Sequence, residues 1–547
     1  MESLSIANGT SYSIANATTT STNRTLTLGN SAGFTNVFSG VANDLIFLSG
    51  NSNLTIQGPN ASTGTGTLSL ALANSGNFNV ATGSTLTINA NISGSVSITK
   101  TGGGTAVINP TKTLYTGNTI INGGTLAAST GDYFGPFNSS ITINAGTLRY
   151  DVTYTGGGNT IVVGSASSAI DTNGSGVSYT PGVISGSGSL TKNGLGTLNL
   201  SSVNTFTGGF TANAGLTNLN VNGALGSVTS VTIGTGATVQ SPGTGTTNVI
   251  NDAASVSLSG TGALDVSGGT ETVGSLASTS GTPFVVIGDF SGTAGSFTVG
   301  DSSSTTFAGV ISGSRATAGA IFTKQGSGTL TLSGANTYTG QTVINNGTLS
   351  LDNAGSTTPR LVNTTNITVN SGGTLLLASS SGSSTDRINN AATITLAGGT
   401  FNLGGRSEGA AGTSGVGALT LTNNSVFDFG TLGTSNLIQF AGLGTHTSSA
   451  LFQIIDWEGT PGSANGTDRL LFAGTSSAFT SLYNQSDVSF NGEFGYDVMD
   501  FGTFYEVFGV AKVPEPSTWA SAALALLAVG YSQRRRFSKQ SALVKIG

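Results

Sequence analysis

The sequence predicts an all-β protein in which short strands stack coil upon coil as a β-solenoid. Three observations predict this class: a repeated unit, strands that alternate apolar and hydroxyl residues, and abundant glycine with little charge. The 547 residues include 84 glycines, 17 basic residues and 23 acidic residues. Disorder would need more charge and fewer β-branched residues, and collagen would need more than the 10 prolines and a three-residue period.

Three stretches of the chain share one skeleton, and they span residues 92–126, 184–216 and 311–349. Each has an Ile-Ser-Gly-Ser lead, a Lys followed by Gly-x-Gly, an alternating run and an aromatic-Thr-Gly. Copies one and three then end in Gly-Thr-Leu, whereas Gly215-Leu216 in the second copy lacks the threonine. The lysines are Lys100, Lys192 and Lys324, and the aromatic residues are Tyr115, Phe206 and Tyr338. Such self-similarity indicates a stacked architecture.

Shorter units between these copies are typical of strand, turn and strand. Examples are SSITINAGTLRYDV from Ser139 and NITVNSGGTLLLA from Asn366, in which a Gly or Asn-Gly pair breaks an alternating run. No amphipathic helix is expected before residue 512. At about 20–25 residues per coil and about 4.8 Å between strands, residues 1–440 would form on the order of 20 coils and a rod of about 90 Å.

The composition suits the inner and outer faces of such coils. Inward Leu, Ile, Val and Phe would form continuous stacks that bury apolar area, worth about 25 cal/mol per Å². Outward Thr, Ser and Asn keep the surface hydrated without charge, and Asn can form hydrogen-bonded ladders. Glycine allows the positive φ angles of the corners. Few charges avoid the stacking of like charges on adjacent coils, so the repeats are interpreted as a scaffold.

The segment GSGTLTLSGANTYTGQTVINNGTL at 326–349 resembles the autotransporter-associated β-strand repeat of bacterial surface proteins. This resemblance implies a right-handed parallel β-helix over residues 70–430, with no catalytic residues. The long array of membrane strands that ends an autotransporter is absent from the sequence. The repeats are therefore expected to work without that translocator.

The C-terminal stretch VPEPSTWASAALALLAVGYSQRRRFSKQ resembles a PEP-CTERM sorting signal. Pro514, Glu515 and Pro516 form the motif, residues 517–533 are uncharged, and Arg534, Arg535 and Arg536 follow as a membrane-flanking basic cluster. Seventeen uncharged residues lie at the short limit of a transmembrane helix, and the arginines obey the positive-inside rule. The alternative is a buried terminal helix. The resemblance implies export, handling by exosortase-type sorting machinery and cleavage near the motif.

Three regions are therefore expected: a β-solenoid at 1–444, a short β cap at 445–512 and the sorting signal at 513–547. The cap region holds much of the aromatic and acidic content and resembles the β segment that often ends such repeats. The start, MESLSIANGTSYSIANATTT, shows no secretory signal peptide. Either the protein stays inside the cell or its start codon is misassigned, and the C-terminal motif favours the second reading.

Composition excludes several kinds of chemistry. The chain has no cysteine, hence no disulfide framework, zinc-thiolate site or thiol nucleophile. His446 is the single histidine, which is expected in a surface loop and cannot form a histidine metal cluster. A net charge of −6 argues against a broad nucleic-acid-binding surface, because phosphate binding needs clustered Lys and Arg, and no nucleic acid is expected as a partner. No catalytic, cofactor-binding or metal-binding residue is expected.

Several residues still need a functional interpretation beside a structural one. The acids of 1–444 are scattered singly, for example Asp132, Asp151, Asp171, Asp252 and Asp265, whereas glycosidases need two carboxylates about 5–10 Å apart. Asp456 and Glu458 flank Trp457, and Asp497 and Asp500 follow; a solvated acidic face is preferred over a calcium or sugar site. The repeat lysines are expected to cap turns, and the repeat aromatic residues to pack on a neighbouring coil rather than on sugars.

The sequence as a whole predicts an exported, non-enzymatic β-solenoid sorted at the membrane through its C-terminus. A structural or adhesive role at the cell surface or in an extracellular matrix follows, with exopolysaccharide or other surface glycans as candidate partners. The alternative is a carbohydrate-active β-helix enzyme, a lyase or a hydrolase. Acids and a base that converge in one groove would favour the enzyme.

Overall fold

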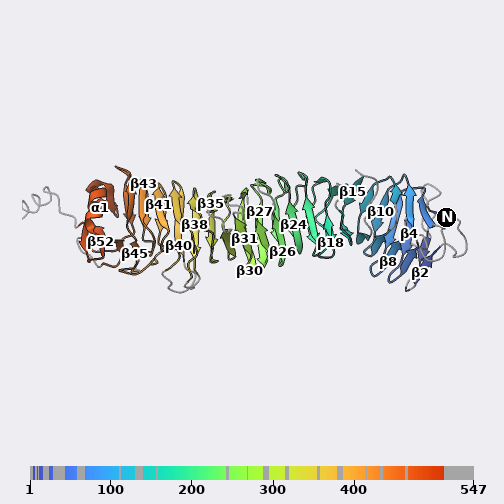
Figure 1. The fold of residues 1–547 in the computed structure, drawn as a ribbon, viewed down its shortest axis with the longest axis horizontal. Coiled ribbons are helices and arrows are strands. Elements are labelled where there is room, and N and C mark those ends of the chain that lie inside the picture. The colour runs from blue at the N-terminus through green and yellow to red at the C-terminus, as the bar shows by residue number, and fades with distance from the viewer. Residues whose placement is uncertain are drawn as a thin grey trace, which may run out of the picture.

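The computed structural model forms one long rod, with the first strands at one end and helix α1 at the other (Figure 1). It describes residues 4–510 apart from some short segments. Those segments are 7–8, 10, 16–23, 29–43, 58–67, 110–112, 130–138, 155–157, 242–245, 268, 288–294, 314–318, 354–357, 379–385, 414, 432–434 and 462–465. The Pro514–Pro516 motif, the run 517–533 and the arginines 534–536 lie outside the described residues. No helix in the described part is long and apolar enough to cross a membrane.

Strands of successive coils pair in parallel, which confirms the predicted all-β solenoid. Side chains that hydrogen-bond across one coil are 20 residues apart for Asn193 and Asn213 and 26 apart for Asn402 and Asp428. Consecutive strands of a coil, such as β17, β18 and β19, contribute to three different sheets, so we describe the rod by three sides. The expected right-handed sense of the coil stays a prediction.

Side one carries an eight-stranded parallel sheet in each half of the rod. The N-terminal sheet consists of β1 (Leu4–Ile6), β4 (Asp44–Leu48), β7 (Gly76–Val80), β10 (Ile98–Thr101), β13 (Thr119–Ile121), β15 (Ser140–Ile143), β17 (Thr160–Val163) and β20 (Ile184–Ser185). The C-terminal sheet consists of β29 (Thr270–Val273), β32 (Ser296–Val299), β35 (Ile321–Lys324), β37 (Thr342–Ile344), β39 (Asn366–Asn370), β41 (Thr393–Ala397), β43 (Leu419–Asn423) and β46 (Leu443–His446).

Side two is the most continuous, with a twelve-stranded sheet followed by a nine-stranded one. The first consists of β2 (Ser11–Ile14), β5 (Asn53–Ile56), β8 (Thr85–Ile88), β11 (Thr105–Ile108), β14 (Thr125–Ala128), β16 (Gly146–Tyr150), β18 (Ser168–Thr172), β21 (Leu190–Asn193), β23 (Phe210–Ala212), β25 (Ser230–Ile233), β27 (Ser255–Gly260) and β30 (Ser275–Gly281). The second consists of β33 (Thr305–Phe307), β36 (Thr329–Leu332), β38 (Gly347–Asp352), β40 (Gly373–Ala378), β42 (Thr400–Asn402), β44 (Ser425–Asp428), β47 (Phe452–Ile455), β49 (Val488–Phe490) and β50 (Glu493–Phe494).

Side three is divided into three sheets of four, seven and four strands. The first two consist of β3 (Arg24–Leu28), β6 (Leu68–Leu72), β9 (Asn91–Gly94) and β12 (Thr113–Tyr115), then β19 (Ser178–Tyr179), β22 (Thr197–Leu200), β24 (Gly215–Leu219), β26 (Ala237–Gln240), β28 (Ala263–Asp265), β31 (Phe284–Ile287) and β34 (Val310–Gly313). The last consists of β45 (Leu437–Phe440), β48 (Arg469–Ala473), β52 (Phe504–Gly509) and β51 (Tyr496–Asp500).

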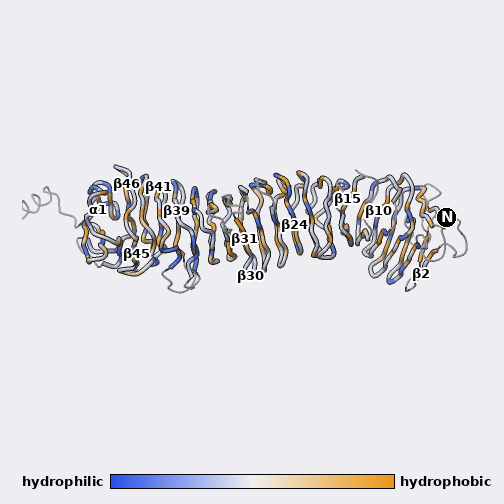
Figure 2. Tube along the Cα trace, in the orientation of Figure 1, coloured by the Kyte–Doolittle hydropathy of each residue, from blue (hydrophilic) through white to orange (hydrophobic). Residues whose placement is uncertain are grey.

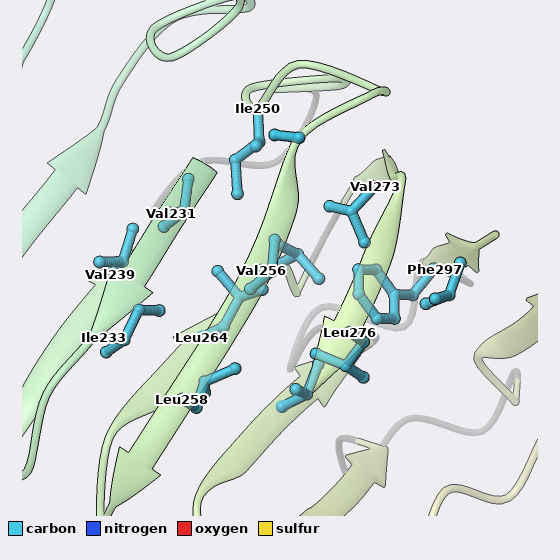
Figure 3. Close-up of a cluster of buried hydrophobic side chains, with 14 of the residues drawn as sticks. Val231, Ile233, Val239, Ile250, Val256, Leu258, Leu264, Val273, Leu276 and Phe297 are labelled. Carbon is cyan, nitrogen blue, oxygen red and sulfur yellow. The ribbon is translucent and has the colours of Figure 1, made fainter. Parts of the chain in front are cut away.

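The core runs along the axis of the rod because each strand alternates inward and outward residues. In β36, Leu330 and Leu332 are buried while Thr329 and Thr331 are half-buried. The hydropathy of the chain alternates accordingly (Figure 2). Figure 3 shows aliphatic side chains of neighbouring coils meeting inside the rod, among them Val256 and Leu276, which pair in register. Every coil thus adds the same kind of layer to one continuous apolar column.

A cap of mixed structure closes the C-terminal end of the rod. Strand β52 pairs antiparallel with β48 and β51, and β49 pairs antiparallel with β50. The cap also contains α1 (Ser476–Leu482), which buries Phe479, and a 3-10 turn at Gln485–Asp487. The sequence predicts no amphipathic helix before residue 512, and α1 does not show as one because seven residues with one buried side chain have too little periodicity to be seen in the sequence.

Glycine is required where a corner of one coil touches the next. Gly326 has a φ of +70°, and a Cβ there would lie 2.4 Å from the Asp301 carbonyl oxygen of the neighbouring coil. Gly236 has a similar φ of +76°, but a Cβ at this position would have no neighbouring atom within 4 Å. Substitutions at the two positions therefore distinguish the effect of backbone strain from the effect of crowding between coils.

We expect Gly236→Ala to cost about 1 kcal/mol, which is the strain of a left-handed alanine. Gly326→Ala should cost about 1–3 kcal/mol more because of overpacking against the Asp301 carbonyl. Thermal unfolding of both variants measures the difference. Equal losses of stability would show that coil contact does not select this glycine.

Candidate functional site

The three repeat lysines point into the rod and bind backbone oxygens. Lys100 Nζ donates hydrogen bonds to the carbonyls of Thr101 at 2.7 Å, Gly102 at 2.8 Å and Gly123 at 3.2 Å. The first two belong to the turn that follows the lysine, and Gly123 belongs to the corresponding turn of the next coil. Each ammonium group therefore ties its own turn to the turn stacked on it.

The other two copies repeat this geometry. Lys192 Nζ donates to Asn193, Gly194 and Ala214, at 3.1, 2.6 and 2.9 Å. Lys324 Nζ donates to Gln325, Gly326 and Asn346, at 2.5, 2.8 and 3.3 Å. We call these arrangements lysine clamps. They are the turn capping that the sequence led us to expect.

Burial opposes the charge on these lysines, while the clamp geometry favours it. Desolvation lowers the pKa of Lys100 and of Lys192 to about 8, and it also lowers the pKa of Lys324. Three carbonyl acceptors match the three N–H donors of an ammonium group. A lysine whose donors are all used inside the rod cannot act on an external substrate, so the clamps are structural.

The repeat aromatic residues are buried and pack inside the rod, as predicted. The Tyr115 hydroxyl lies 2.7 Å from Thr119 Oγ1, and the Tyr338 hydroxyl lies 2.6 Å from Thr342 Oγ1. In the second copy, Phe206 occupies the tyrosine position and Phe210 the threonine position. Both partners of the hydrogen bond are therefore exchanged together, which leaves no buried hydroxyl unpaired. None of these rings is available to a sugar.

Each full repeat is followed by coils that have strands on two sides only, among the described residues. After copy one, side three lacks strands between β12 and β19; after copy two, side one lacks them between β20 and β29; after copy three, side three lacks them between β34 and β45. We call these the first, second and third strand gaps. Isolated bridges, such as Leu225 with Ile250, keep the backbone stacked across them.

The second and third gaps begin and end with the same polar devices. An asparagine opens each gap: Asn204 Oδ1 accepts the N–H of Ile184, and Asn336 Oδ1 accepts the N–H of Ile311, both at 2.8 Å. A glutamate closes each gap and accepts two backbone N–H groups of the preceding coil. Sequence reasoning missed these glutamates, because their partners lie about one coil upstream.

Glu271 closes the second gap and Glu408 the third. Glu271 accepts the N–H groups of Val249 at 2.7 Å and Ile250 at 3.1 Å. Glu408 Oε1 accepts those of Arg387 at 2.9 Å and Ile388 at 3.0 Å. The signal was present in the sequence as twin segments, NVINDAASV at 248–256 and DRINNAATI at 386–394.

The third gap also contains a fully buried ion pair. Arg387 Nη1 lies 3.7 Å from Glu408 Oε2, and neither side chain is exposed. Arg387 Nε donates to the Ala378 carbonyl at 2.9 Å, and Arg360 donates to Thr358 at 2.5 Å. Desolvation raises the pKa of Glu408 to about 8 and lowers that of Arg387, and it raises the pKa of Glu271 to about 7. These acids face backbone and protein interior, not an open groove.

The remaining acids that the sequence singled out are dispersed or structural. Asp132 lies outside the described residues. Asp151 pairs with Arg149 at 2.9 Å, while Asp171 lies in β18 on side two, Asp252 in a loop of side one and Asp265 in β28 on side three. No group of three acids or histidines able to hold a metal occurs in the described part.

In the cap, Trp457 is buried and its indole N–H donates to the Asp468 carbonyl at 3.0 Å. Asp500 accepts hydrogen bonds from the Ser476 N–H at 2.9 Å and its hydroxyl at 2.6 Å, at the start of α1. His446 was expected in a surface loop, but it lies in β46 with its ring stacked on Tyr483 at 4.1 Å. Its two ring nitrogens face the carbonyls of Leu482 and Ala450, at 2.8 and 2.9 Å. These contacts hold the cap together.

Fold and clamps together define a class of protein: a parallel β-solenoid built from recurring two-coil units. Comparison with family models gives the particular kind. The passenger-associated-transport-repeat model matches residues 98–128, 190–217 and 322–351, and the PEP-CTERM protein-sorting motif matches 512–536. The chain thus carries three copies of this repeat and a C-terminal sorting motif. No curated protein matches the chain, and no solved structure does.

Each matched repeat includes a lysine clamp and the two coils that it joins. Residues 98–128 run from β10, which carries Lys100, to β14 in the next coil. The sorting match includes Pro514–Pro516 and Arg534–Arg536. Repeats and sorting motif support an exported, envelope-associated protein that is sorted through its C-terminus.

Replacing a clamp lysine by an apolar residue should destabilise the rod. Lys192→Met removes the ammonium donor from three inward carbonyls, so we expect a loss of about 1–3 kcal/mol in the free energy of unfolding. Thr191→Met, at the outward neighbour on the same strand, is the matched control and should change stability little. Hydrogen exchange at the 193–196 and 213–216 turns reads the effect locally. Unchanged protection there would refute the clamp.

The buried glutamates make stability depend on pH. Glu408 ionises near pH 4.5 when unfolded but near pH 8 when folded, so the folded chain binds more protons between these values. Stability should be full below pH 4.5 and fall as pH rises toward 8. Glu408→Gln should flatten this slope in thermal melts, whereas the exposed Glu493→Gln should preserve it. A wild-type melting temperature that increases between pH 4.5 and pH 8 would contradict the assignment.

Proposed function

We propose that this protein is a non-catalytic scaffold of the cell envelope or extracellular matrix, with adhesion to glycans as its role. The observation that carries the proposal is that the ionisable side chains of the repeats bind backbone groups inside the rod. The three clamp lysines and both gap glutamates bind backbone groups inside the rod, as described above. These charged groups therefore join neighbouring coils, and the surface of the repeats presents mainly hydroxyl and amide groups.

The outward surface of side one illustrates what such a scaffold presents. One column of outward residues runs in register from β29 to β43 and contains a single residue other than threonine. The column consists of Thr272, Thr298, Thr323, Val343, Thr368, Thr395 and Thr420. On side three, Asn218 donates to Asn199 at 2.8 Å, and Gln240 donates to Asn218 at 2.9 Å, forming a ladder across three coils. Neutral surfaces of this kind suit hydrated polysaccharide better than charged partners.

Membrane handling at the C-terminus completes the proposal. Six residues, 511–516, separate the last described residue from the uncharged run 517–533. A span of six residues reaches at most about 20 Å. A membrane helix at 517–533 would therefore hold the cap end of the rod close to the bilayer until exosortase-type machinery cuts near the motif.

Fractionation of cells tests this function. With one epitope at the N-terminus and one after Gly547, in a host that carries an exosortase, we expect the first epitope in the matrix fraction and the second in the membrane. Replacing Pro514, Glu515 and Pro516 by alanine should keep both epitopes together in the membrane, because the sorting motif is lost. Immunoblots of the fractions provide the measurement.

Pro461→Ala, an exposed proline of the cap outside the motif, is the matched control and should behave as the wild type. Both epitopes in the cytoplasm would defeat the proposal. Release of reducing sugar from matrix polysaccharide by the purified full chain would favour the carbohydrate-active enzyme instead.

A further inference from the structure

A cleft of about 600 Å³ opens on side one in the middle of the rod. It lies within the second strand gap, where the coils cross this side as loops between β20 and β29. Polar residues of two successive loops line it. They are Asn222, Gly223, Thr247, Asn248, Asn251 and Asp252. The volume falls in the range of small-molecule sites.

The floor of the cleft is fixed from beneath. Ile250 lines the cleft, and its side chain joins the core cluster (Figure 3). Glu271, 2% exposed, binds the backbone N–H groups of Val249 and Ile250 from the coil below. Asn251 Nδ2 donates to the Val228 carbonyl of the coil above at 2.9 Å. The lining loop is therefore pinned to both neighbouring coils.

The walls of the cleft are held together across the two loops. The Thr247 N–H donates to Asn222 Oδ1 at 2.9 Å, and Asn222 Nδ2 donates to Thr247 Oγ1 at 3.3 Å. Asn248 adopts a φ of 56°, and its carbonyl accepts the Gly223 N–H at 2.9 Å. Non-glycine residues rarely adopt this left-handed backbone conformation, and those that do often lie at functional sites. The side chains of Asn248 and Asp252 stay exposed to solvent.

The chemistry of the lining selects a class of ligand. Amide, hydroxyl and carboxylate groups line the cleft, and among the described residues no basic side chain does, so an anionic ligand would meet only Asp252 as a charge. Val203, 59% exposed, adds an apolar rim: a Cβ at Gly223 would lie 3.6 Å from Val203 Cγ1. Hydroxyl-binding groups beside one apolar contact suit a neutral sugar, whose ring has polar edges and an apolar face.

The third strand gap contains a loop that is the structural twin of the loop lining the cleft. Its loop, DRINNAA at 386–392, repeats the hydrogen bonds of NVINDAA at 248–254, including Asn389 to Thr364 at 3.2 Å. The buried guanidinium group of Arg387 occupies the position of Val249, and Asn390 replaces Asp252. At the two exposed lining positions, the twin loop carries Asp386 in place of Asn248 and Asn390 in place of Asp252.

We propose that the cleft of the second strand gap is a binding site for a neutral sugar residue of an extracellular polysaccharide. The Asn248 amide would donate and accept hydrogen bonds with sugar hydroxyls, the Asp252 carboxylate would accept them, and Val203 would contact the apolar face of the ring. This inference rests on the proposed adhesive function and gives it a location. It assigns binding only, because the acid beneath the cleft, Glu271, is buried and held by backbone amides.

The test uses the purified full chain and hexaoses of glucose, mannose and galactose as neutral probes, with hexagalacturonate as the acidic one. Calorimetry or saturation-transfer NMR measures binding. We expect at least one neutral hexaose to bind saturably and hexagalacturonate not to bind. Asn248→Ala and Asp252→Ala should each weaken binding by about tenfold, which corresponds to one lost hydrogen bond of about 1.4 kcal/mol.

Asn390→Ala, at the twin loop, is the matched control and should keep the dissociation constant within about twofold. Thermal melts check that each variant is folded. The inference would be overturned if no neutral hexaose bound saturably or if the chain preferred hexagalacturonate. It would also be overturned if both cleft variants bound the hexaose as tightly as the wild type does. If the chain still reaches the matrix fraction in that event, the inference about the cleft fails while the proposed function stands.

Discussion

Register between coils is the constraint on which the rest of the structure depends. Each residue lies over its counterpart in the next coil, one strand spacing of about 4.8 Å away. A charge that recurred at one position would therefore stack on its like. The chain places its buried charges singly and satisfies most of them with backbone groups, as Lys192 and Glu271 do. Clamps and gap glutamates are two solutions to the same problem, which is how to join coils without a ladder of ion pairs.

The sequence was sufficient to predict what repeats at short range. Alternation and glycine placement predicted parallel coils, and the position of Lys100 before a glycine turn predicted its capping role. It was insufficient where one side chain meets backbone of another coil. Nothing near Glu408 in the sequence indicates the Arg387 and Ile388 amides that it binds. The cleft was likewise hidden, because it depends on two loops 25 residues apart, such as those of Asn222 and Thr247.

Repetition in sequence and repetition in space are not the same in this rod. Lys100 and Lys324 lie on side one, in β10 and β35, whereas Lys192 lies on side two, in β21. The coil β17–β19 has a strand on side three, which the two coils before it lack. The lead strand of the second copy therefore lies on side one instead of side three. A strand gap follows each copy on the side of its lead strand, so the gaps change sides as well. The rod therefore displays its irregular loops in more than one direction, although its sequence repeats a single unit.

The coil-to-coil organisation has a mechanical consequence. Because each coil contacts mainly the coil before and the coil after, tension applied along the chain is resisted by one interface at a time. Loosening would begin at an end and proceed as a series of small, separate ruptures rather than a single collapse. A rod of this design would absorb work over its whole extension.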